Sequence, residues 1–239
     1  MNSAFDYLIR VDNPGLLGEP AALAGAVADR VLRADLARPG FALLDPGEQP
    51  DARAFRALLV ALARALGGHY RTRFGGDLVF LSLSRFDQQA STRPHRDGGP
   101  DESVLLLGYE PTALGSRLFL YDYTRCALDR GLTSAELLAR FNPAFGANQE
   151  LLRDYTTPLR EFRHDRHQVL VINNSTRPFE ERRRGMLGVL HQAVMTASDL
   201  TRSRVINSLL LATAEAGDGA GLSAEAVQAF VDSAAAAAV

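Results

Sequence analysis

The sequence predicts a mainly β domain with flanking helices, an α+β fold whose strands form two facing sheets. The hydrophobic pattern is helical in the N-terminal part and becomes strand-like from Asp77 onwards. Gly and Pro residues separate the strand-like runs, as turns between antiparallel strands require. About eight such runs are present, which is the size of a double-sheet, cupin-like jelly-roll barrel, also called a double-stranded β-helix.

The N-terminal part, about residues 1–70, is predicted to be a helical buttress of the barrel. Residues 19–36 have apolar side chains at helical spacing. Phe41–Leu44 is predicted to be a short strand, because it is apolar and stops at turn residues. A second helix is predicted from Asp51 to Leu66, with one apolar stripe and with Gly67-Gly68 closing it.

The remaining elements follow from the change of period at Asp77. Residues 134–154 are predicted to be a helical or irregular insertion between strands. The C-terminal part, about residues 222–239, is predicted to be an alanine-rich helix that either packs on the barrel or contacts another subunit, so the oligomeric state is left open. The predicted strands are Leu78–Ser84, the segment around His95, Ser103–Tyr109, Arg117–Tyr123, Pro158–Phe162, Gln168–Ile172, Leu187–Val194 and Arg202–Leu211.

Composition limits the classes of protein that the chain can belong to. With 239 residues and 46% hydrophobic content, the sequence is predicted to form one domain over residues 1–239. The net charge of −2 gives no basic field, so nucleic acid is not an expected partner. The single cysteine, Cys126, fits a reducing compartment. Residues 1–6 lack a basic region followed by an apolar core, and no window approaches the ~18 apolar residues of a membrane span, so a cytoplasmic protein is expected.

The segment Arg93–Gly99 holds the main candidate for chemistry. His95 and Asp97 are two residues apart, so in extended chain they project to the same face while Arg96 points away. An imidazole nitrogen and a carboxylate oxygen are two of the three ligands in the facial triad of non-haem Fe(II) oxygenases. The third ligand must come from another segment. His191, in an apolar strand-like run that precedes a strand beginning near Arg202, is the candidate.

The ordered set His95-Arg96-Asp97, His191 and an arginine at position 202 or 204 resembles the Fe(II)/2-oxoglutarate-dependent dioxygenases. The resemblance covers roughly residues 40–211 and depends on four or five positions. It implies Fe(II) bound by His95, Asp97 and His191, with 2-oxoglutarate as co-substrate and dioxygen as oxidant. It also implies oxidation of a C–H bond, such as hydroxylation or desaturation. Halogenating members have a small residue where this chain has Asp97, so halogenation is not expected.

The same resemblance implies that one arginine binds the distal carboxylate of 2-oxoglutarate. A guanidinium suits this role because its planar fork makes two parallel charge-assisted hydrogen bonds. Arg202 and Arg204 would lie on the same face of the last strand, so both remain candidates. Arg204 is favoured because it lies deeper in the predicted strand. The alternative for either is an exposed cation at a strand edge.

Other interpretations of these residues stay open. His95 and Asp97 could belong to a solvated surface turn, and His191 could be a buried histidine bonded to backbone. His164 and His167 have turn spacing that can bind metal, and His69 follows the end of a predicted helix. At the level of the whole protein, the alternatives are a cupin-like metalloenzyme that does not use 2-oxoglutarate and a non-catalytic barrel that binds small molecules.

The substrate is expected to be a small molecule with an anionic group, such as an amino acid or another metabolite acid. The loop of residues 175–185 contains four arginines and precedes the strand of His191. Arginine clusters suit carboxylates and phosphates, and Arg71, Arg73 and Arg93 are expected to add to the same rim. The alternative is a solvated loop whose arginines pair with its own glutamates.

Overall fold

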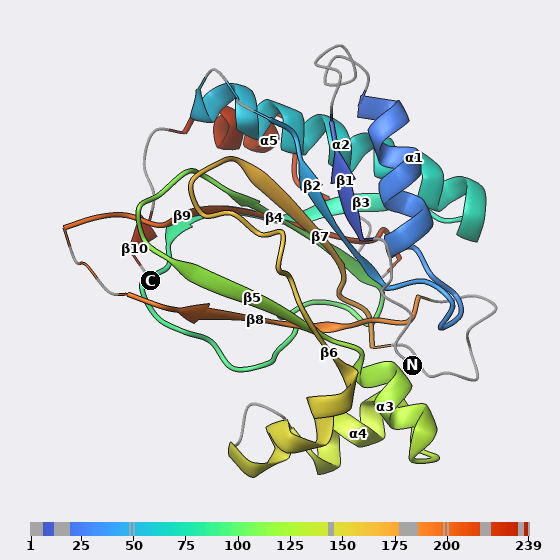
Figure 1. Cartoon of the computed structure of the whole chain (residues 1–239). Coiled ribbons are helices and arrows are strands. Elements are labelled where there is room, and N and C mark those ends of the chain that lie inside the picture. The colour runs from blue at the N-terminus through green and yellow to red at the C-terminus, as the bar shows by residue number, and fades with distance from the viewer. Residues whose placement is uncertain are drawn as a thin grey trace.

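The computed structural model describes residues 7–11, 20–47, 49, 51–142, 146–176, 186–197, 199, 201–215, 221–233 and 237–238. These residues form two sheets with helices on both sides (Figure 1). The large sheet has the order β1 (Leu8–Arg10), β2 (Phe41–Asp45), β7 (Gln168–Asn173), β4 (Ser103–Tyr109), β9 (Val205–Thr213), β3 (Leu78–Asp87) and β10 (Ala237–Ala238). The small sheet has the order β6 (Thr156–Pro158), β5 (Ser116–Tyr121) and β8 (Leu190–Met195).

This arrangement is consistent with a jelly-roll-like α+β fold, but it corrects the predicted closed barrel. Among the described strands, no ladder joins the large sheet to the small one. The strands of the large sheet from β2 to β3 pair antiparallel, whereas its two edge strands, β1 and β10, pair parallel with their neighbours. An apolar core with side chains from both sheets lies between them.

Strand β4 shows how the large sheet supports two apolar cores. Alternate side chains of a strand point to opposite faces, and every residue of β4 is buried. Val104 and Leu106 belong to the core under the helices, whereas Leu105 and Leu107 belong to the core between the two sheets. An uninterrupted apolar run is therefore the expected pattern for this strand.

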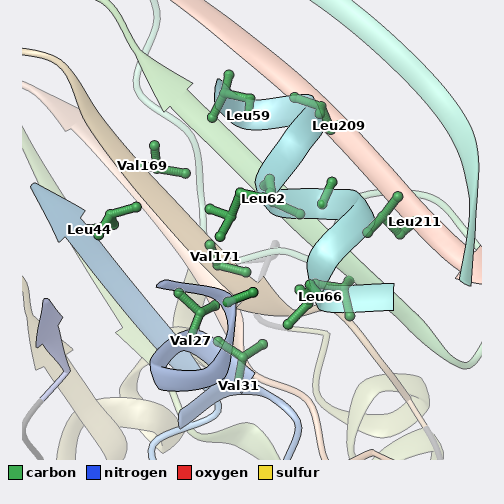
Figure 2. Close-up of a cluster of buried hydrophobic side chains, with 14 of the residues drawn as sticks. Val27, Val31, Leu44, Leu59, Leu62, Leu66, Val169, Val171, Leu209 and Leu211 are labelled. Atoms are coloured by element: carbon green, nitrogen blue, oxygen red, sulfur yellow. The ribbon is translucent and has the colours of Figure 1, made fainter. Parts of the chain in front are cut away.

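Helices α1 (Pro20–Val31), α2 (Ala52–Phe74) and α5 (Ala224–Asp232) cover the outer face of the large sheet (Figure 1). Figure 2 shows side chains of α1 and α2 pointing at those of the strands. The labelled residues are Val27, Val31, Leu59, Leu62 and Leu66 from the helices, and Leu44, Val169, Val171, Leu209 and Leu211 from the strands. Burying each such side chain stabilises the fold by about 1.5–3 kcal/mol.

The predicted insertion forms a helical layer against the small sheet. It consists of α3 (Tyr123–Asp129), α4 (Ser134–Arg140) and the 3₁₀ segment η2 (Gly146–Tyr155). A third apolar cluster joins Tyr121 of β5 and Leu190 of β8 to side chains of this layer. The layer therefore covers the face of the small sheet that points away from the large sheet.

Helix α2 is longer than the sequence indicated. It continues through Gly67-Gly68 and ends at Gly75, whose φ of 82° and bond to the Arg71 carbonyl form a left-handed C-cap. The extra turns are stabilised by tertiary contacts, since Arg73 donates to the carbonyls of Ala28 and Leu32 at the end of α1. Packing has overridden the weak helix propensity of the two glycines.

The predicted C-terminal helix over about residues 222–239 is also corrected. Helix α5 ends at Asp232, and residues 237–238 instead pair with β3. Arg56 of α2 donates to the carbonyls of Val231 and Ser233, which fixes the end of α5 against α2. The apolar side of α5 packs on the core of this chain. None of the helices in the described part combines the length and apolar character that a transmembrane span requires.

Candidate metal centre

Backbone pairing brings the two predicted histidine ligands together. His95 lies in the link between β3 and β4, and His191 is the second residue of β8. Each donates its amide to the carbonyl of the other, with N···O distances of 3.0 and 2.8 Å. Directly opposed residues of an antiparallel pair project to the same face. The two imidazole rings consequently lie side by side, with centroids 4.3 Å apart.

Asp97 completes the cluster. Its Oδ1 atom is 3.4 Å from His95 Nε2 and 3.6 Å from His191 Nε2. One ligand atom from each residue lies within 4.8 Å of the others, and no other such group occurs among the described histidine, cysteine and acidic residues. Atoms held about 2.1 Å from one ion at right angles are about 3 Å apart, so small side-chain rotations would let all three bind a single cation.

The three side chains differ in their access to solvent. The side chain of His191 is 10% exposed, whereas those of His95 and Asp97 are each 34% exposed. A cation at this place would thus be held from the interior and remain open on one side. This is the arrangement that a catalytic metal needs, since reactants must enter its coordination sphere.

Electrostatics favour the ligand forms of His191 and Asp97, whereas His95 must give up a proton before it can bind a metal. Burial and the neighbouring His95 lower the pKa of His191 to about 4, so its imidazole is neutral near pH 7. Burial acts to raise the pKa of Asp97, but the hydrogen bond with His95 and the field of His191 outweigh it and lower that pKa. Burial likewise opposes the raised pKa of His95, which the Asp97 carboxylate and the Arg93 carbonyl cause. A neutral imidazole and an ionised carboxylate are the forms that bind metal.

The backbone carbonyl of Arg93 orients His95. It lies 2.7 Å from Nδ1, so Nδ1 carries the proton and donates it to this bond. Nε2, which faces Asp97, is then the nitrogen whose loss of a proton would give the lone pair that binds a metal. Bonds of this kind to the second nitrogen fix the tautomer and direction of metal-ligating histidines.

Asn174 fixes the position of Asp97, and the sequence analysis did not identify it. It is fully buried just after β7. Its Oδ1 accepts from the Asp97 amide at 3.0 Å, and its Nδ2 donates to the Asp97 carbonyl at 3.1 Å and to Ser103 Oγ at 3.1 Å. A side-chain amide that bonds both backbone groups of one residue acts like a neighbouring strand. Only the tertiary structure shows this contact, because 77 positions separate the two residues.

Arg96, which points away from the cluster as predicted, ties down the same loop. Its guanidinium donates to the carbonyls of Asn174, Gly99 and Pro100 at 3.1, 2.8 and 2.8 Å. The loop that carries His95 and Asp97 is therefore bonded to the end of β7 by both a side-chain amide and a guanidinium. Such bonds restrict the movement of metal ligands.

A buried ion pair anchors the chain segment that leads into β8. Arg33, 2% exposed, forms a fork with the Asp122 carboxylate at 2.9 and 2.7 Å and donates to the Leu187 carbonyl at 2.8 Å. Gly188 follows, and a Cβ atom there would lie 2.0 Å from the Ser175 carbonyl oxygen. The segment before His191 thus packs too closely on the end of β7 to accept a side chain.

Arg202 and Arg204 lie in different environments, and both precede strand β9, which begins at Val205 rather than near Arg202. The shared strand face predicted for them is therefore wrong. The Arg202 side chain is 56% exposed and pairs with Asp199 at 3.1 Å. Arg204 is 2% exposed. Burial, and not the alternation of faces along a strand, therefore distinguishes the two candidate arginines.

The Arg204 guanidinium is a buried cation without a carboxylate partner among the described residues. Nε donates to Ser116 Oγ at 3.1 Å, Nη1 donates to Gln88 Oε1, and Nη2 is buried without a hydrogen bond. Cζ lies 5.1 Å from the centroid of the Tyr109 ring. Burial lowers the pKa of Arg204, although Tyr109 and Asp87 act to raise it. An arginine stays charged in proteins, so an unmatched buried guanidinium is suited to an anionic ligand.

The competing histidines lie elsewhere. His167 packs against the Phe55 ring of α2 in a tilted arrangement, with centroids 4.5 Å apart, and burial lowers the pKa of His167. The His164 backbone carbonyl accepts from the Thr112 amide. The His69 ring packs against Gly25 of α1. None of these three is part of the cluster with Asp97.

Two arginines of the predicted cationic rim form ion pairs at the end of α2. Arg71 pairs with Asp77, and Arg73 pairs with Asp29 at 2.8 Å, so both serve to fix the end of α2. Within the predicted arginine loop, only Ser175 and Thr176 lie in the described part, and residues 177–185 lie outside it. The expected role of that loop in binding an anionic substrate is untested.

Comparison with known proteins finds similarity only at the level of solved structures. No protein-family model matches the chain, and no curated protein is significantly similar to it. One similar structure is AAD-2 in complex with Mn(II) and N-oxalylglycine, at 11% identity, 89% of this chain and 95% of that chain covered, and a TM-score of 0.38. Another is a variant of the iron and alpha-ketoglutarate-dependent endoperoxidase NvfI, at 12% identity, 79% and 83% covered, and a TM-score of 0.34. At these values neither similarity assigns an activity to this chain.

Proposed function

We propose that the chain is a non-haem Fe(II)- and 2-oxoglutarate-dependent oxygenase that hydroxylates, or otherwise oxidises, a C–H bond of a small molecule. The observation that supports it best is the pair of sites inside one fold: a two-histidine, one-carboxylate cluster and a buried guanidinium with an unbonded Nη2. The cluster suits a divalent cation with open positions, and the guanidinium suits a carboxylate.

His95, Asp97 and His191 would hold the metal. Two neutral nitrogens and one carboxylate suit Fe(II), and three protein ligands leave positions for reactants. When bound, Fe(II) supplies the activation of dioxygen that protein side chains cannot supply. The chain itself holds the ligands in place through Asn174 and the Arg93 carbonyl.

Arg204 would bind the distal carboxylate of 2-oxoglutarate. Ser116 and Gln88 already hold two of its nitrogens, so the guanidinium is oriented before the ligand arrives. The Tyr109 ring beneath it keeps water from that side, and burial raises the pKa of Tyr109 to about 12, so this phenol stays neutral. The overall reaction would convert the substrate C–H, 2-oxoglutarate and dioxygen into C–OH, succinate and carbon dioxide.

A binding experiment separates the two arginines. Anaerobic protein with Fe(II) would be titrated with 2-oxoglutarate, and the visible charge-transfer band of a chelated 2-oxo acid would be followed. Arg204→Ala is expected to weaken 2-oxoglutarate binding by about 1.5–3 kcal/mol, because a charged hydrogen bond is lost. Arg202→Ala is the matched control and should leave affinity unchanged, since its side chain is exposed and bound to Asp199.

The outcomes of this titration are distinct. Equal affinity in wild type and Arg204→Ala would remove Arg204 from the proposal. Binding of Fe(II) without any response to 2-oxoglutarate would reject the co-substrate and leave a cupin-like metalloenzyme. Thermal unfolding of each variant without metal shows whether the substitution has only damaged the fold.

The proposed substrate is a small molecule with at least one anionic group, supported by the arginine-rich composition of residues 177–185. Succinate release would be screened across matched acidic and neutral small molecules, in the wild type and in Arg182→Ala and Arg183→Ala. Turnover confined to acidic compounds and lowered by these substitutions is expected. A neutral substrate, or turnover indifferent to both changes, would contradict an anion-selecting loop.

A further inference from the structure

A second positively charged site lies at an edge of the fold, distinct from the proposed metal centre. Strand β1 is an edge of the large sheet, and strand β6 is an edge of the small sheet. The two edges lie near each other, since Tyr7, beside β1, donates its hydroxyl to Glu161 in the turn after β6. Between them is a cleft of about 550 Å³. This volume is within the range of about 300–1,000 Å³ that small-molecule sites occupy.

Arginines dominate the charge of this cleft. Its lining consists of Leu8, Arg10, Val11, Asp45, Gly47, Arg160, Glu161, Arg163 and Arg166. Four cations and two carboxylates give the described lining an excess of two positive charges. Leu8 and Val11 supply an apolar surface for the uncharged part of a ligand.

The carboxylates of the lining are already engaged. Asp45 Oδ1 accepts from the Gly47 amide at 3.2 Å, and its Oδ2 accepts from Arg166 at 3.2 Å. Glu161 accepts from the Tyr7 hydroxyl. The acidic groups thus serve to shape the cleft, and they leave part of its positive charge unmatched.

Two of the arginines have no acidic partner among the described residues. Arg163 pairs with Asp165 at 2.8 Å and Arg166 pairs with Asp45, but no described carboxylate is within ion-pair distance of Arg10 or Arg160. These two come from separate segments, Arg10 from β1 and Arg160 from the turn after β6. The turn is ordered by hydrogen bonds of its backbone amides, since the Phe162 amide donates to the Leu159 carbonyl and the Arg163 amide donates to the Gln168 side-chain Oε1.

We propose that this cleft binds a small molecule carrying two or more negative charges on phosphate or carboxylate groups, with Arg10 and Arg160 as its main contacts. Guanidinium forks bind both kinds of group through paired, charge-assisted hydrogen bonds. Two arginines from separate segments of the lining suit a ligand with more than one charged group. The site does not depend on the metal centre or on 2-oxoglutarate.

Calorimetric titration of the full chain without metal tests this site, using pyrophosphate and citrate as probes at matched ionic strength. Arg204→Ala is titrated in parallel, so that any binding of the probes at Arg204 is separated from binding at the cleft. Wild type is expected to bind at least one probe saturably, and Arg10→Gln with Arg160→Gln should weaken that binding about tenfold or more, as expected for lost charge-assisted bonds. Arg153→Gln, an exposed arginine paired with Glu150 elsewhere, is the control and should bind like wild type.

The two probes distinguish the source of the charge. Tighter binding of pyrophosphate indicates a phosphorylated ligand, and tighter binding of citrate indicates a polycarboxylate. Absence of saturable binding in wild type, or equal affinity in wild type and the double variant, would overturn the proposal. Unfolding temperatures of the variants establish that they are folded, which exposed arginine substitutions are expected to preserve.

Discussion

Asn174 is the residue on which the geometry of Asp97 depends most directly. Both atoms of its side-chain amide bond the backbone of Asp97, and the amide is buried. Its neighbour Asn173 is equally buried but donates to the Val31 carbonyl of α1 at 3.0 Å. The two adjacent amides thus support different parts of the molecule, which makes them a matched pair.

The first prediction concerns this pair. Asn174→Asp keeps the shape and the acceptor but loses the donor, so Asp97 should lose its fixed position and metal affinity should fall about 10- to 100-fold. Asn173→Asp should destabilise the fold by about 1–3 kcal/mol through an unsatisfied buried carbonyl, with metal affinity unchanged. Titration with Co(II), followed by its visible spectrum, and unfolding of the metal-free protein measure the two effects. Equal metal affinity in Asn174→Asp and wild type would contradict the positioning role.

At the scale of elements, the segment that leads into β8 is more constrained than its sequence suggests. Gly188 packs directly on the Ser175 carbonyl, whereas Gly68 lies inside α2 with no atom within 4 Å of its hypothetical Cβ. In the sequence, Gly68 was predicted to close a helix and Gly188 to lie in a strand, and neither prediction indicates which glycine is required. Only the contacts of the folded chain separate a glycine that is required from one that merely weakens a helix.

Opposite effects are therefore predicted for two alanine substitutions. Gly188→Ala should destabilise the fold by about 1–3 kcal/mol or more, because the backbone before His191 must move. Gly68→Ala should stabilise it by about 0.4–1 kcal/mol, since alanine fits a helix interior and restricts the unfolded chain. Chemical denaturation of the metal-free proteins measures both changes. A neutral Gly188→Ala would show that the close approach to Ser175 is not needed.

The ion pair between Arg33 and Asp122 gives a further prediction at this scale. Arg33→Ala removes a buried guanidinium, so the Leu187 carbonyl loses its donor and, among the described residues, the Asp122 carboxylate keeps only its contacts with Arg125. Breaking a buried pair in this way is expected to cost about 3–5 kcal/mol of unfolding free energy. Arg153→Ala breaks an exposed pair with Glu150 and should change it by less than about 0.5 kcal/mol. Similar unfolding curves for the two variants would contradict the anchoring role of Arg33.

At the scale of the whole molecule, the strongly periodic elements were predictable and the long-range contacts were not. The apolar run of β4 and the apolar stripe of α2 are visible in the sequence because burial requires apolar side chains at these positions. The continuation of α2 past Gly67-Gly68 depends on Arg73 reaching α1, which no local pattern encodes. The two-sheet form likewise depends on which strand edges meet.

The site shows the same division. His95, Asp97 and His191 were selected by residue type and order, and the fold brings them within 4.8 Å of one another. The preference for Arg204 over Arg202 agrees with its burial, but the reason given for it, depth within a strand, was wrong because both precede β9. Asn174 gave no signal, because its partner is 77 positions away.

Ligand binding should also stabilise the folded chain as a whole. A ligand that binds only the native state adds about 2.7 kcal/mol at 100 times its Kd. Fe(II) under anaerobic conditions should therefore raise the unfolding temperature of wild type and not that of Asp97→Ala. 2-Oxoglutarate should add a further increase only when metal is present. An equal increase in wild type and Asp97→Ala would indicate that Fe(II) binds elsewhere.

The most direct test of the proposed metal centre is the Fe(II) content of anaerobically reconstituted protein. Wild type is predicted to bind one Fe(II) per chain, and His95→Ala, Asp97→Ala and His191→Ala are each predicted to lose it. His167→Ala serves as the control, since this histidine packs against Phe55 and is not part of the cluster, and the variant should bind metal like wild type. Full occupancy in both Asp97→Ala and His191→Ala would contradict the assignment of these residues as metal ligands.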